Sequence, residues 1–413
     1  MSEDRAHTIG MLASVIFWSL FAIRYVAVMT NFGRVLRYRA IKPTEQPAFN
    51  SYDCSVIIPI SDLGNPNLET IIRSILQNNV YALYLVTVGP GRLYRLNNFV
   101  SALRTEFPDA LIHVGAKARA NKRQQLAYAI REIPTNITVL ADDGVFWPQN
   151  FLEKCLAPFE DARVGGVSVN KRVSRQALGF SWESFRSFLA HVYFQNIEYK
   201  NMAVANLKNH TINVVDGQTA FYRTEILNER DFLHSFLTED FFFHKCGPFH
   251  AGDDSFITRW LVKTDWKIVF QSTGEDCIRI PLRDNKTSVE HLERRLRNNY
   301  RSHLKSYDAF FVASFALTPI ARNDMGMLGI LIAIHLFTKL VKIVPVFTRN
   351  PKDIVFLPAL FFADYAFGLL KFKAVLDLAD THWYPDQFYE ANHAQNDNGD
   401  LPWSWGHRRV RAW

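Results

Sequence analysis

Residues 137–148, ITVLADDGVFWP, place two adjacent carboxylates, Asp142 and Asp143, directly after a strand-like apolar run. A second acidic pair, Asp253 and Asp254, follows a glycine in AGDDSFITRW, residues 251–260, and precedes a helix-like run. Each pair stands at the end of a strand or loop, where the ligand sites of α/β sheets gather. One pair can hold a divalent cation through its oxygens while the other moves a proton. The two pairs therefore predict one site for metal binding and acid–base chemistry.

Strand-like and helix-like runs alternate along the first half of the chain. Strands are expected at CSVIIPI (54–60), LYLVTVG (83–89), LIHVGA (111–116) and ITVLADD (137–143). Helical spacing is seen in LETIIRSILQN (68–78) and in NKRQQLAYAIREI (121–133), and an aromatic helix is expected over 180–199. Further strand-like runs occupy 164–170, 211–223 and 266–272. This alternation predicts an α/β fold with a mostly parallel sheet and helices on both faces.

Composition limits the class of protein. The chain has 413 residues, enough for one large core with appended segments, and a formal net charge of +7. The basic residues are scattered, so we expect no nucleic-acid partner and instead a membrane lipid surface or a phosphate-bearing substrate. The four cysteines form no CxxC pair, which argues against a zinc site and favours buried, reduced thiols on a cytosolic face.

Apolar segments stand near both ends of the chain. Residues 1–30 are expected to form an N-terminal transmembrane helix, followed by a linker over 31–52. Basic residues cluster just after the helix, so the positive-inside rule places the next domain, 53–285, in the cytoplasm. A cleavable signal peptide is the alternative, but the N-terminus is acidic and a clear small-residue cleavage site is lacking. If the domain over 53–285 is cytoplasmic, the sequons at Asn136, Asn209 and Asn285 are chance matches without glycan.

The C-terminal part is expected to return to the membrane. Residues 286–306 form a strongly basic amphipathic stretch, predicted as an interfacial helix. Membrane segments are expected over 307–375, of which 325–347 and 353–372 are long enough to span and 310–321 is short for a span. With the N-terminal helix this gives three spans and leaves a fourth open. Residues 376–413 are expected to be a polar tail.

Several charged residues could act together with the acidic pairs at one site. Lys122 and Arg123 open a helix upstream of Asp142 and could meet phosphates, although the alternative for both is a surface charge. The basic stretch offers further cations, with lipid-headgroup binding as its alternative: His291, Arg294, Arg297 and Arg301. A competing acidic motif, Thr238-Glu239-Asp240, lies shortly before Asp253.

Five motifs in order resemble those of processive family 2 glycosyltransferases, the group that contains hyaluronan, chitin and cellulose synthases. These are CSVIIPI, NKRQQLAYAI, VLADDGVFWP, DGQTAFYRTEI and AGDDSFITRWLV. The wording of ADDGVFWP and DDSFITRWL is similar to the fungal hyaluronan-synthase-like, capsular polysaccharide synthase type. The resemblance implies a GT-A fold and an inverting transfer from a UDP-sugar to a growing cell-wall or capsular polysaccharide. It also implies Mn²⁺ or Mg²⁺ as cofactor and a location at the plasma membrane.

The resemblance also implies roles for individual residues. Asp254 matches the base that deprotonates the acceptor hydroxyl, with Asp253 as its catalytic neighbour. Asp143 matches the metal ligand of the family's DxD motif. The residues that it implies for binding the donor or acceptor are Lys122, Asp142, Gly217, Thr219, Arg223, Arg294 and Arg297.

Three departures from the family pattern leave alternatives open. Ala141 takes the place of the first acid of the DxD motif. In the motif that reads QxxRW in the family, His291 replaces Gln and Arg295 replaces Trp, which leaves processivity open. Thr238-Glu239-Asp240 resembles the family's TED by its letters, but the phrase after it does not continue as the family does, so this motif is not assigned as the base site. The alternatives are an inactive relative that binds nucleotide or lipid as a membrane scaffold, or a non-processive transferase.

Overall fold

The computed structural model describes residues 3–174, 181–205, 215, 217–240, 252–272, 274, 276–281, 315, 318, 325–358 and 401–404. The chain divides into two compact units that each combine distant segments. The first unit contains Met1–Tyr38, Ala177–Asn206 and Val289–Leu376, and the second contains Arg39–Gln176, Leu207–Ser288 and Asp377–Trp413.

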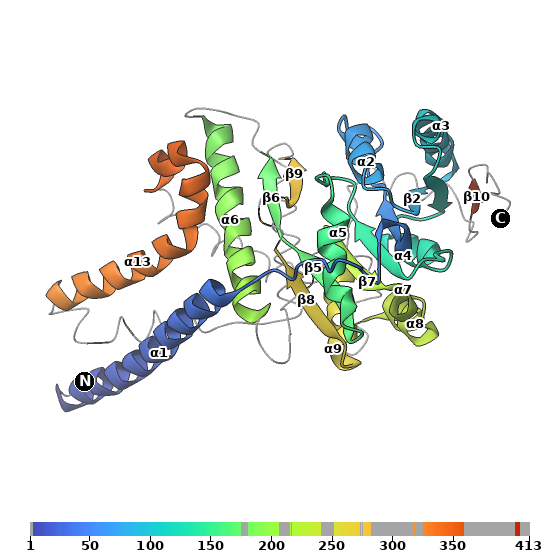
Figure 1. The fold of residues 1–413 in the computed structure, drawn as a ribbon. Helices are drawn as coiled ribbons and strands as arrows, with labels where there is room; N and C mark the ends of the chain where they lie inside the picture. The colour runs from blue at the N-terminus through green and yellow to red at the C-terminus, as the bar shows by residue number, and fades with distance from the viewer. Residues whose placement is uncertain are drawn as a thin grey trace. The chain divides into compact units, whose positions relative to one another are not determined.

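The second unit is built on an eight-stranded mixed sheet with the order β10-β3-β2-β1-β4-β7-β5-β8 (Figure 1). Its strands are β1 (Cys54–Pro59), β2 (Ala82–Val88), β3 (Leu111–Lys117), β4 (Ile137–Ala141), β5 (Val164–Val169), β7 (Thr219–Arg223), β8 (Lys267–Gln271) and β10 (Leu401–Ser404). Strands β3, β2, β1 and β4 are parallel, whereas β7 runs antiparallel to both β4 and β5. The predicted α/β class with a mostly parallel sheet is therefore confirmed.

Helices connect these strands, as the alternating pattern predicts. The helices of the second unit are α2 (Leu68–Leu76), α3 (Pro90–Glu106), α4 (Lys122–Ile130), α5 (Phe151–Leu156), α7 (Thr224–Leu227), α8 (Arg230–Thr238) and α9 (Asp253–Lys263). Short 3₁₀ turns occupy η1 (Ser51–Asp53) and η2 (Ala157–Glu160), and β6 (Lys171–Ser174) pairs in parallel with β9 (Ile278–Pro281) in a separate small sheet.

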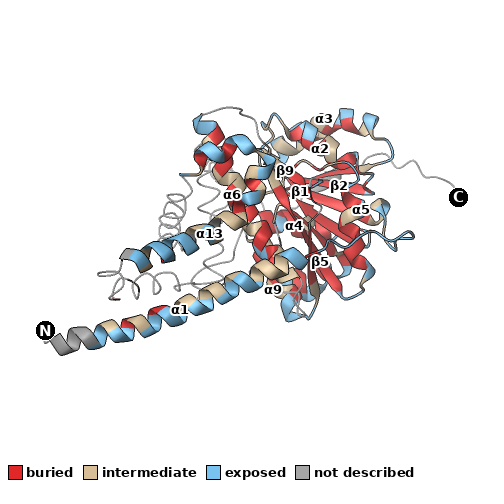
Figure 2. Cartoon of the chain, turned by 60° about the vertical axis from the view of Figure 1, so that its left-hand side comes forward, coloured by how far each residue is buried: buried red, intermediate tan, exposed pale blue. Residues whose placement is uncertain are grey.

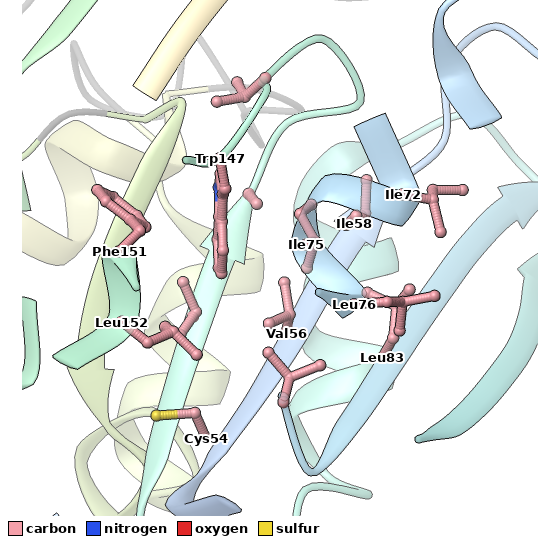
Figure 3. Close-up of a cluster of buried hydrophobic side chains, with 14 of the residues drawn as sticks. Cys54, Val56, Ile58, Ile72, Ile75, Leu76, Leu83, Trp147, Phe151 and Leu152 are labelled. Carbon is pink, nitrogen blue, oxygen red and sulfur yellow. The ribbon is translucent and has the colours of Figure 1, made fainter. Parts of the chain in front are cut away.

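The core of the second unit lies on the central strands. Every residue of β1, β2 and β4 is buried, as expected for parallel strands that are covered on both faces (Figure 2). Figure 3 shows Val56 and Ile58 of β1 against Ile75 of α2, with Trp147 nearby. This packing fixes the carboxyl ends of β1 and β4, where the candidate residues begin.

The thiols of this unit behave as small buried apolar groups. Cys54, Cys155 and Cys277 are buried and free, as the sequence predicts, whereas Cys246 lies outside the described residues. Burial, with a smaller contribution from neighbouring Asp53, raises the pKa of Cys54 well above its ordinary value. Burial likewise raises the pKa of Cys155. Neither thiol is suited to act as a nucleophile.

The first unit contains the apolar helices. Its described elements are α1 (Glu3–Arg37), α6 (Trp182–Ala205), α13 (Met325–Arg349) and the 3₁₀ turn η3 (Pro351–Phe356). Helix α1 exposes large apolar side chains along much of its length (Figure 2) and is long and apolar enough to cross a membrane over Thr8–Arg37. It continues beyond the predicted end at residue 30, because Gly33 alone is too weak a breaker to stop an established helix.

Helix α13 is long and apolar enough to cross a membrane only if its two bent parts are counted together. Its two parts, Gly326–Thr338 and Leu340–Arg349, meet at 44°, and Pro345 lies inside the helix. The predicted span over 353–372 begins in η3, and its residues after 358 lie outside the described part of the chain. Within the part of the chain that the structure describes there is therefore one candidate span, or two if the bent pair is counted.

Helix α6 differs from its predicted place. The sequence assigns it to one continuous domain over 53–285, but it belongs to the first unit together with α1 and α13. Phe188 of α6 packs against Phe356, with 5.5 Å between the ring centroids, and Arg349 donates a 2.7 Å hydrogen bond to Gln195 of α6. Its aromatic residues therefore pack with the terminal helices rather than in the core of the sheet.

The predictions for the C-terminal tail, 376–413, and for the basic stretch, 286–306, have different outcomes. Residues 401–404, predicted as part of a polar tail, form the edge strand β10, in which Leu401 pairs antiparallel with Ala116 of β3. The predicted interfacial helix over 286–306 lies outside the described residues, and with it Arg294 and Arg297.

Candidate functional site

The buried ammonium of Lys122 joins two distant segments of the second unit. Asn121 caps α4, because its side-chain oxygen accepts a 3.1 Å hydrogen bond from the backbone N–H of Gln124. From the first position of this helix, Lys122 Nζ donates a 2.9 Å hydrogen bond to Asp142 Oδ1 and lies 3.1 Å from Asp253 Oδ2. The end of β4 and the start of α9 therefore meet at one cation.

This cation remains charged although it is buried. Burial by itself would lower the pKa of Lys122, but the carboxylates of Asp142, Asp253 and Asp254 outweigh burial and raise the pKa above its ordinary value. Asp253 is also buried, whereas about a third of the Asp142 side chain is exposed, 32%. The site is thus a compact cluster of one cation and several carboxylates, partly open to solvent at Asp142.

Asp254 packs against the chain that leads into β7. A Cβ atom at Gly217 would lie 2.9 Å from Asp254 Oδ2, so this position has no room for a side chain as long as Asp254 stays in place. The backbone carbonyl of Asp254 accepts a hydrogen bond from Thr258 Oγ1, which in turn accepts one from the N–H of Val215. These contacts fix the segment around Gly217 against the first turn of α9.

Asp143 faces a different neighbour from Asp142. Its Oδ2 accepts hydrogen bonds from Ser61 N at 2.8 Å, Ser61 Oγ at 2.6 Å and Asp62 N at 3.3 Å. Asp143 is buried, and it fastens the turn after β1 to the end of β4. Ser61 is not among the residues predicted from the sequence, although its place in a polar turn directly after a buried strand is a signal that could have indicated it.

The register of β7 separates two of the predicted residues. Because β7 runs antiparallel to β4, Thr219 pairs with Ala141 at the carboxyl end of β4, directly before the acidic pair. Arg223 pairs with Ile137 at the opposite end of β4. Four residues of strand place the two ends of β7 roughly 13 Å apart. Thr219 therefore lies at the edge of the candidate site, and Arg223 does not.

Arg223 instead binds backbone groups at the end of the strands opposite the acidic pair. Its guanidinium donates hydrogen bonds to the backbone carbonyls of Val164 at 2.8 Å, Phe159 at 3.0 Å and Asp161 at 3.2 Å. It also lies over the ring of Phe49, 5.6 Å from the centroid. The prediction that Arg223 lies near the substrate is corrected by this position, since its donors are directed to carbonyl groups of the fold.

The structure thus brings together most of the predicted residues that it describes. Lys122, Asp142, Asp253, Asp254 and Gly217 form the cluster, with Thr219 and Asp143 beside it. Arg123, considered for phosphates, is buried and turned toward Glu239. Within the described residues, no three His, Cys, Asp or Glu side chains are grouped to hold a metal ion by themselves.

The chemistry available to this cluster follows from its charges. A buried cation can stabilise a developing negative charge, and a carboxylate beside it can accept a proton. The adjacent oxygens of Asp142 and Asp143 are hard ligands of the type that divalent cations such as Mg²⁺ prefer. The arrangement suits a reaction in which a hydroxyl is deprotonated while an anionic group leaves.

The chain is similar to several known proteins. The family model described as "Glycosyltransferase like family 2" matches residues 54–301. A type 2 glycosyltransferase of Gibberella zeae is 30% identical over 414 residues, which cover 92% of this chain and 77% of that protein. A type 2 glycosyltransferase of Zymoseptoria tritici is 29% identical, with coverage of 89% and 83%. The solved structure of the mannosyltransferase PcManGT from Pyrobaculum calidifontis, in complex with GDP-Man and Mn²⁺, is 16% identical. Its TM-score is 0.47, and the match covers 93% of this chain and 98% of that one.

Replacing Lys122 by Met should lower the free energy of unfolding by about 3–5 kcal/mol, because the buried carboxylate of Asp253 loses its cation and the partly exposed Asp142 loses its partner. The folded pKa of Lys122 is raised above the unfolded value of about 10.4, so its stabilisation is fully present below about pH 10. Above that pH it declines, and it is lost as pH rises through the folded pKa. Chemical denaturation from pH 7 to 11 should show a constant difference between wild type and variant up to about pH 10, then a decrease.

The matched control is Lys263→Met, because Lys263 is exposed at the other end of α9. This change should have little effect at any of these pH values. A wild-type advantage that already disappears between pH 7 and 9 would contradict the ion-pair assignment.

Proposed function

The chain belongs to glycosyltransferase family 2, and from that membership we propose that it moves a sugar from a UDP-sugar, with inversion, to a growing cell-wall or capsular polysaccharide. It is a glycosyltransferase whose mostly parallel sheet is GT-A-like. The observation that carries the proposal is the cluster of Lys122, Asp142, Asp253 and Asp254 at the carboxyl edge of β4. This cluster supplies a base and a cation to one reaction site.

In this proposal Asp254 activates the acceptor. Its half-buried carboxylate takes the proton of an acceptor hydroxyl while the hydroxyl oxygen bonds to the anomeric carbon of the donor sugar. The bond from that carbon to the diphosphate oxygen breaks with its electron pair, and UDP leaves. The main chain at Gly217 packs directly on the Asp254 carboxylate and keeps its orientation. Attack from the face opposite the leaving group inverts the anomeric configuration.

Lys122 serves the leaving diphosphate in the same proposal. An ammonium group has three donors, and its raised pKa keeps all three protonated when charge develops on UDP. Asp253 contacts Lys122 directly, which suits it to orient the ammonium rather than to act as the base. Asp142 is more exposed than Asp253 and is assigned to the donor side of the site.

A divalent cation, Mn²⁺ or Mg²⁺, is proposed to enter with the donor, with Asp143 as its ligand. Three hydrogen bonds from the turn after β1 fix the Asp143 carboxylate, and adjacent Asp142 offers further oxygen atoms. The described residues group no three such ligands, so phosphate oxygens and water would complete the coordination, as is common for Mg²⁺. When bound, the cation neutralises charge on the diphosphate.

The remaining substrate contacts are proposed with narrower support. Thr219, at the edge of the sheet beside Ala141, is assigned to the region of the transferred sugar, together with Gly217. Arg294 and Arg297 stay in the proposal as diphosphate contacts and lie outside the described residues. Arg223 is left out because it lies at the opposite end of β4. Transfer of one or a few sugars, rather than processive extension, is the alternative that Arg295 motivates.

Helix α1 supports a location at a membrane, proposed to be the plasma membrane. It is long and apolar enough to cross a bilayer, and its last turn carries Arg34 and Arg37. By the positive-inside rule these arginines favour a cytoplasmic position for the second unit, where nucleotide sugars would reach it. Membrane lipid is accordingly a proposed partner of the first unit.

Asp254→Asn should abolish transfer while leaving the fold and donor binding in place. Loss of a general base costs about 10²- to 10⁴-fold in rate, and Asn keeps the shape of the side chain. The measurement is UDP release by the detergent-solubilised full chain with a panel of UDP-sugars and Mn²⁺ or Mg²⁺. Asp265→Asn is the matched control, since Asp265 is exposed just after α9 and has a φ of 60° that Asn tolerates well.

The outcomes of this experiment separate the alternatives. Release with one donor that is lost only in Asp254→Asn identifies the donor and supports the base. UDP binding without release from any UDP-sugar in the wild type would contradict the proposed donor chemistry and favour a scaffold role. The length of the product distinguishes processive extension from addition of one or a few sugars.

Asp143→Asn should weaken metal binding without disrupting the turn after β1. The remaining amide oxygen can still accept from Ser61, but the negative charge that attracts the cation is lost. We expect at least a ten-fold higher Mn²⁺ concentration for half-maximal UDP release, and no release by either protein after chelation. The control is Asp62→Asn, whose side chain instead accepts from the backbone of Gly64. Equal metal curves for Asp143→Asn and wild type would rule out Asp143 as ligand.

The cytoplasmic placement predicts an unmodified sequon at Asn136. Asn136 is exposed at the start of β4, so a lumenal second unit would offer it for glycosylation. Expression in a eukaryotic host should give a chain whose mobility is unchanged by endoglycosidase. As control, a cleavable secretory signal in place of residues 1–37 should produce a glycan that Asn136→Gln removes. A glycan on Asn136 of the full chain would overturn the proposed topology.

A further inference from the structure

Arg123 follows Lys122 in α4 but is directed to a separate set of partners. Its side chain is 2% exposed, which makes it one of the largest fully buried side chains among the described residues. Its Nη1 donates to the carbonyl of Phe236 at 2.9 Å, and its Nη2 donates to Glu239 Oε2 at 2.7 Å and to the carbonyl of Gly252 at 3.2 Å. One guanidinium thus joins α4, the end of α8 and the start of α9.

The surroundings of this guanidinium hold it in a single orientation. It lies over the rings of Phe236 and Phe256, 5.2 and 5.4 Å from their centroids. The planar fork of arginine can satisfy several acceptors at fixed angles, which a lysine cannot do. Glu239 supplies the countercharge that a buried cation requires, and its other oxygen pairs with Arg259.

Gly252 is the residue through which this contact reaches the catalytic acids. It stands directly before Asp253 and adopts a φ of +74°, and its carbonyl accepts the hydrogen bond of Phe256 N at 3.1 Å in the first turn of α9. Arg123 binds the same carbonyl. Consecutive residues of α4 therefore hold the start of α9 in two ways, Arg123 by the main chain at Gly252 and Lys122 by the side chain of Asp253.

We propose that Arg123 and Glu239 are positioning residues that fix the start of α9, so that the Asp254 carboxylate keeps its place relative to Lys122. This inference rests on the proposed transferase function and adds two residues to it. It also gives a role to the motif Thr238-Glu239-Asp240. Glu239 acts through Arg123 and does not touch the substrate. A shift of the base by about 1 Å is enough to cost roughly 10²-fold in rate.

Glu239→Gln tests the proposal with little change of shape. It removes the charge that holds Arg123 while keeping an oxygen that can accept a hydrogen bond. We expect kcat for sugar transfer to fall at least ten-fold, with the KM for the donor within about two-fold of wild type, because Lys122 and Asp142 are untouched. Glu225→Gln is the matched control, since Glu225 is exposed on α7, and it should leave both constants unchanged.

A second measurement reports directly on how firmly the start of α9 is held and does not depend on catalytic activity. Hydrogen exchange of a peptide that covers 252–258 should be faster in Glu239→Gln, because the first turn of α9 loses an anchor. Exchange in β1 and β4 should stay at the wild-type rate. Arg123→Lys keeps the charge but loses the fork, so it should show the same local increase in exchange.

These measurements distinguish a failure of the proposed transferase function from a failure of the positioning role. If the wild type releases no UDP from any donor, the proposed function fails, while hydrogen exchange still reports whether Arg123 and Glu239 hold α9. The positioning role is overturned if Glu239→Gln keeps kcat within two-fold of wild type. It is also overturned if the loss of kcat comes with faster exchange throughout the sheet, which would show general destabilisation rather than misplacement of α9.

Discussion

The structure of the second unit depends on one buried charge. An ammonium group inside a protein must be paired, because its desolvation is otherwise far more costly than folding can offset. Lys122 finds its partners in Asp142, at the end of β4, and Asp253, at the start of α9. Segments more than a hundred residues apart are therefore required to meet at one point. The sheet makes this possible because β4 lies centrally, between β1 and β7.

Other features of the site follow from that meeting. Once α9 is placed beside β4, the chain entering β7 must pass close to Asp254, and only glycine leaves room at position 217. The turn after β1 is likewise held to β4 by Asp143, so the loops around the cluster are tied to the same end of the sheet. The apolar core formed by β1, β2 and α2 keeps that end of the sheet in place. The chemistry of the site is thus supported by apolar packing that contributes no reactive group.

The sequence predicts the features that depend on local patterns. Continuous apolar runs indicate the buried parallel strands, and the carboxyl ends of such strands converge, so Asp142 and Lys122 could be expected to meet. Pairing direction and partner choice are not local properties. The reversal of β7 sends Arg223 to the opposite end of β4 although it is only four residues from Thr219. Helix α6 has an aromatic pattern that predicts burial, but not that its partners are α13 and η3. The sequence assigns Glu239 no role, because the pairing of its carboxylate with Arg123 depends on tertiary contacts that no local pattern reveals.

The site is built from pairs of adjacent residues whose members have different partners. Asp142 contacts Lys122 while Asp143 contacts Ser61, and Lys122 contacts carboxylates while Arg123 contacts the main chain of α9. For Lys122 and Arg123 the cause is geometric, since successive side chains point about 100° apart around a helix. Adjacent charges in this chain are therefore not duplicates, because the two members of each pair hold different segments of the second unit at the same site.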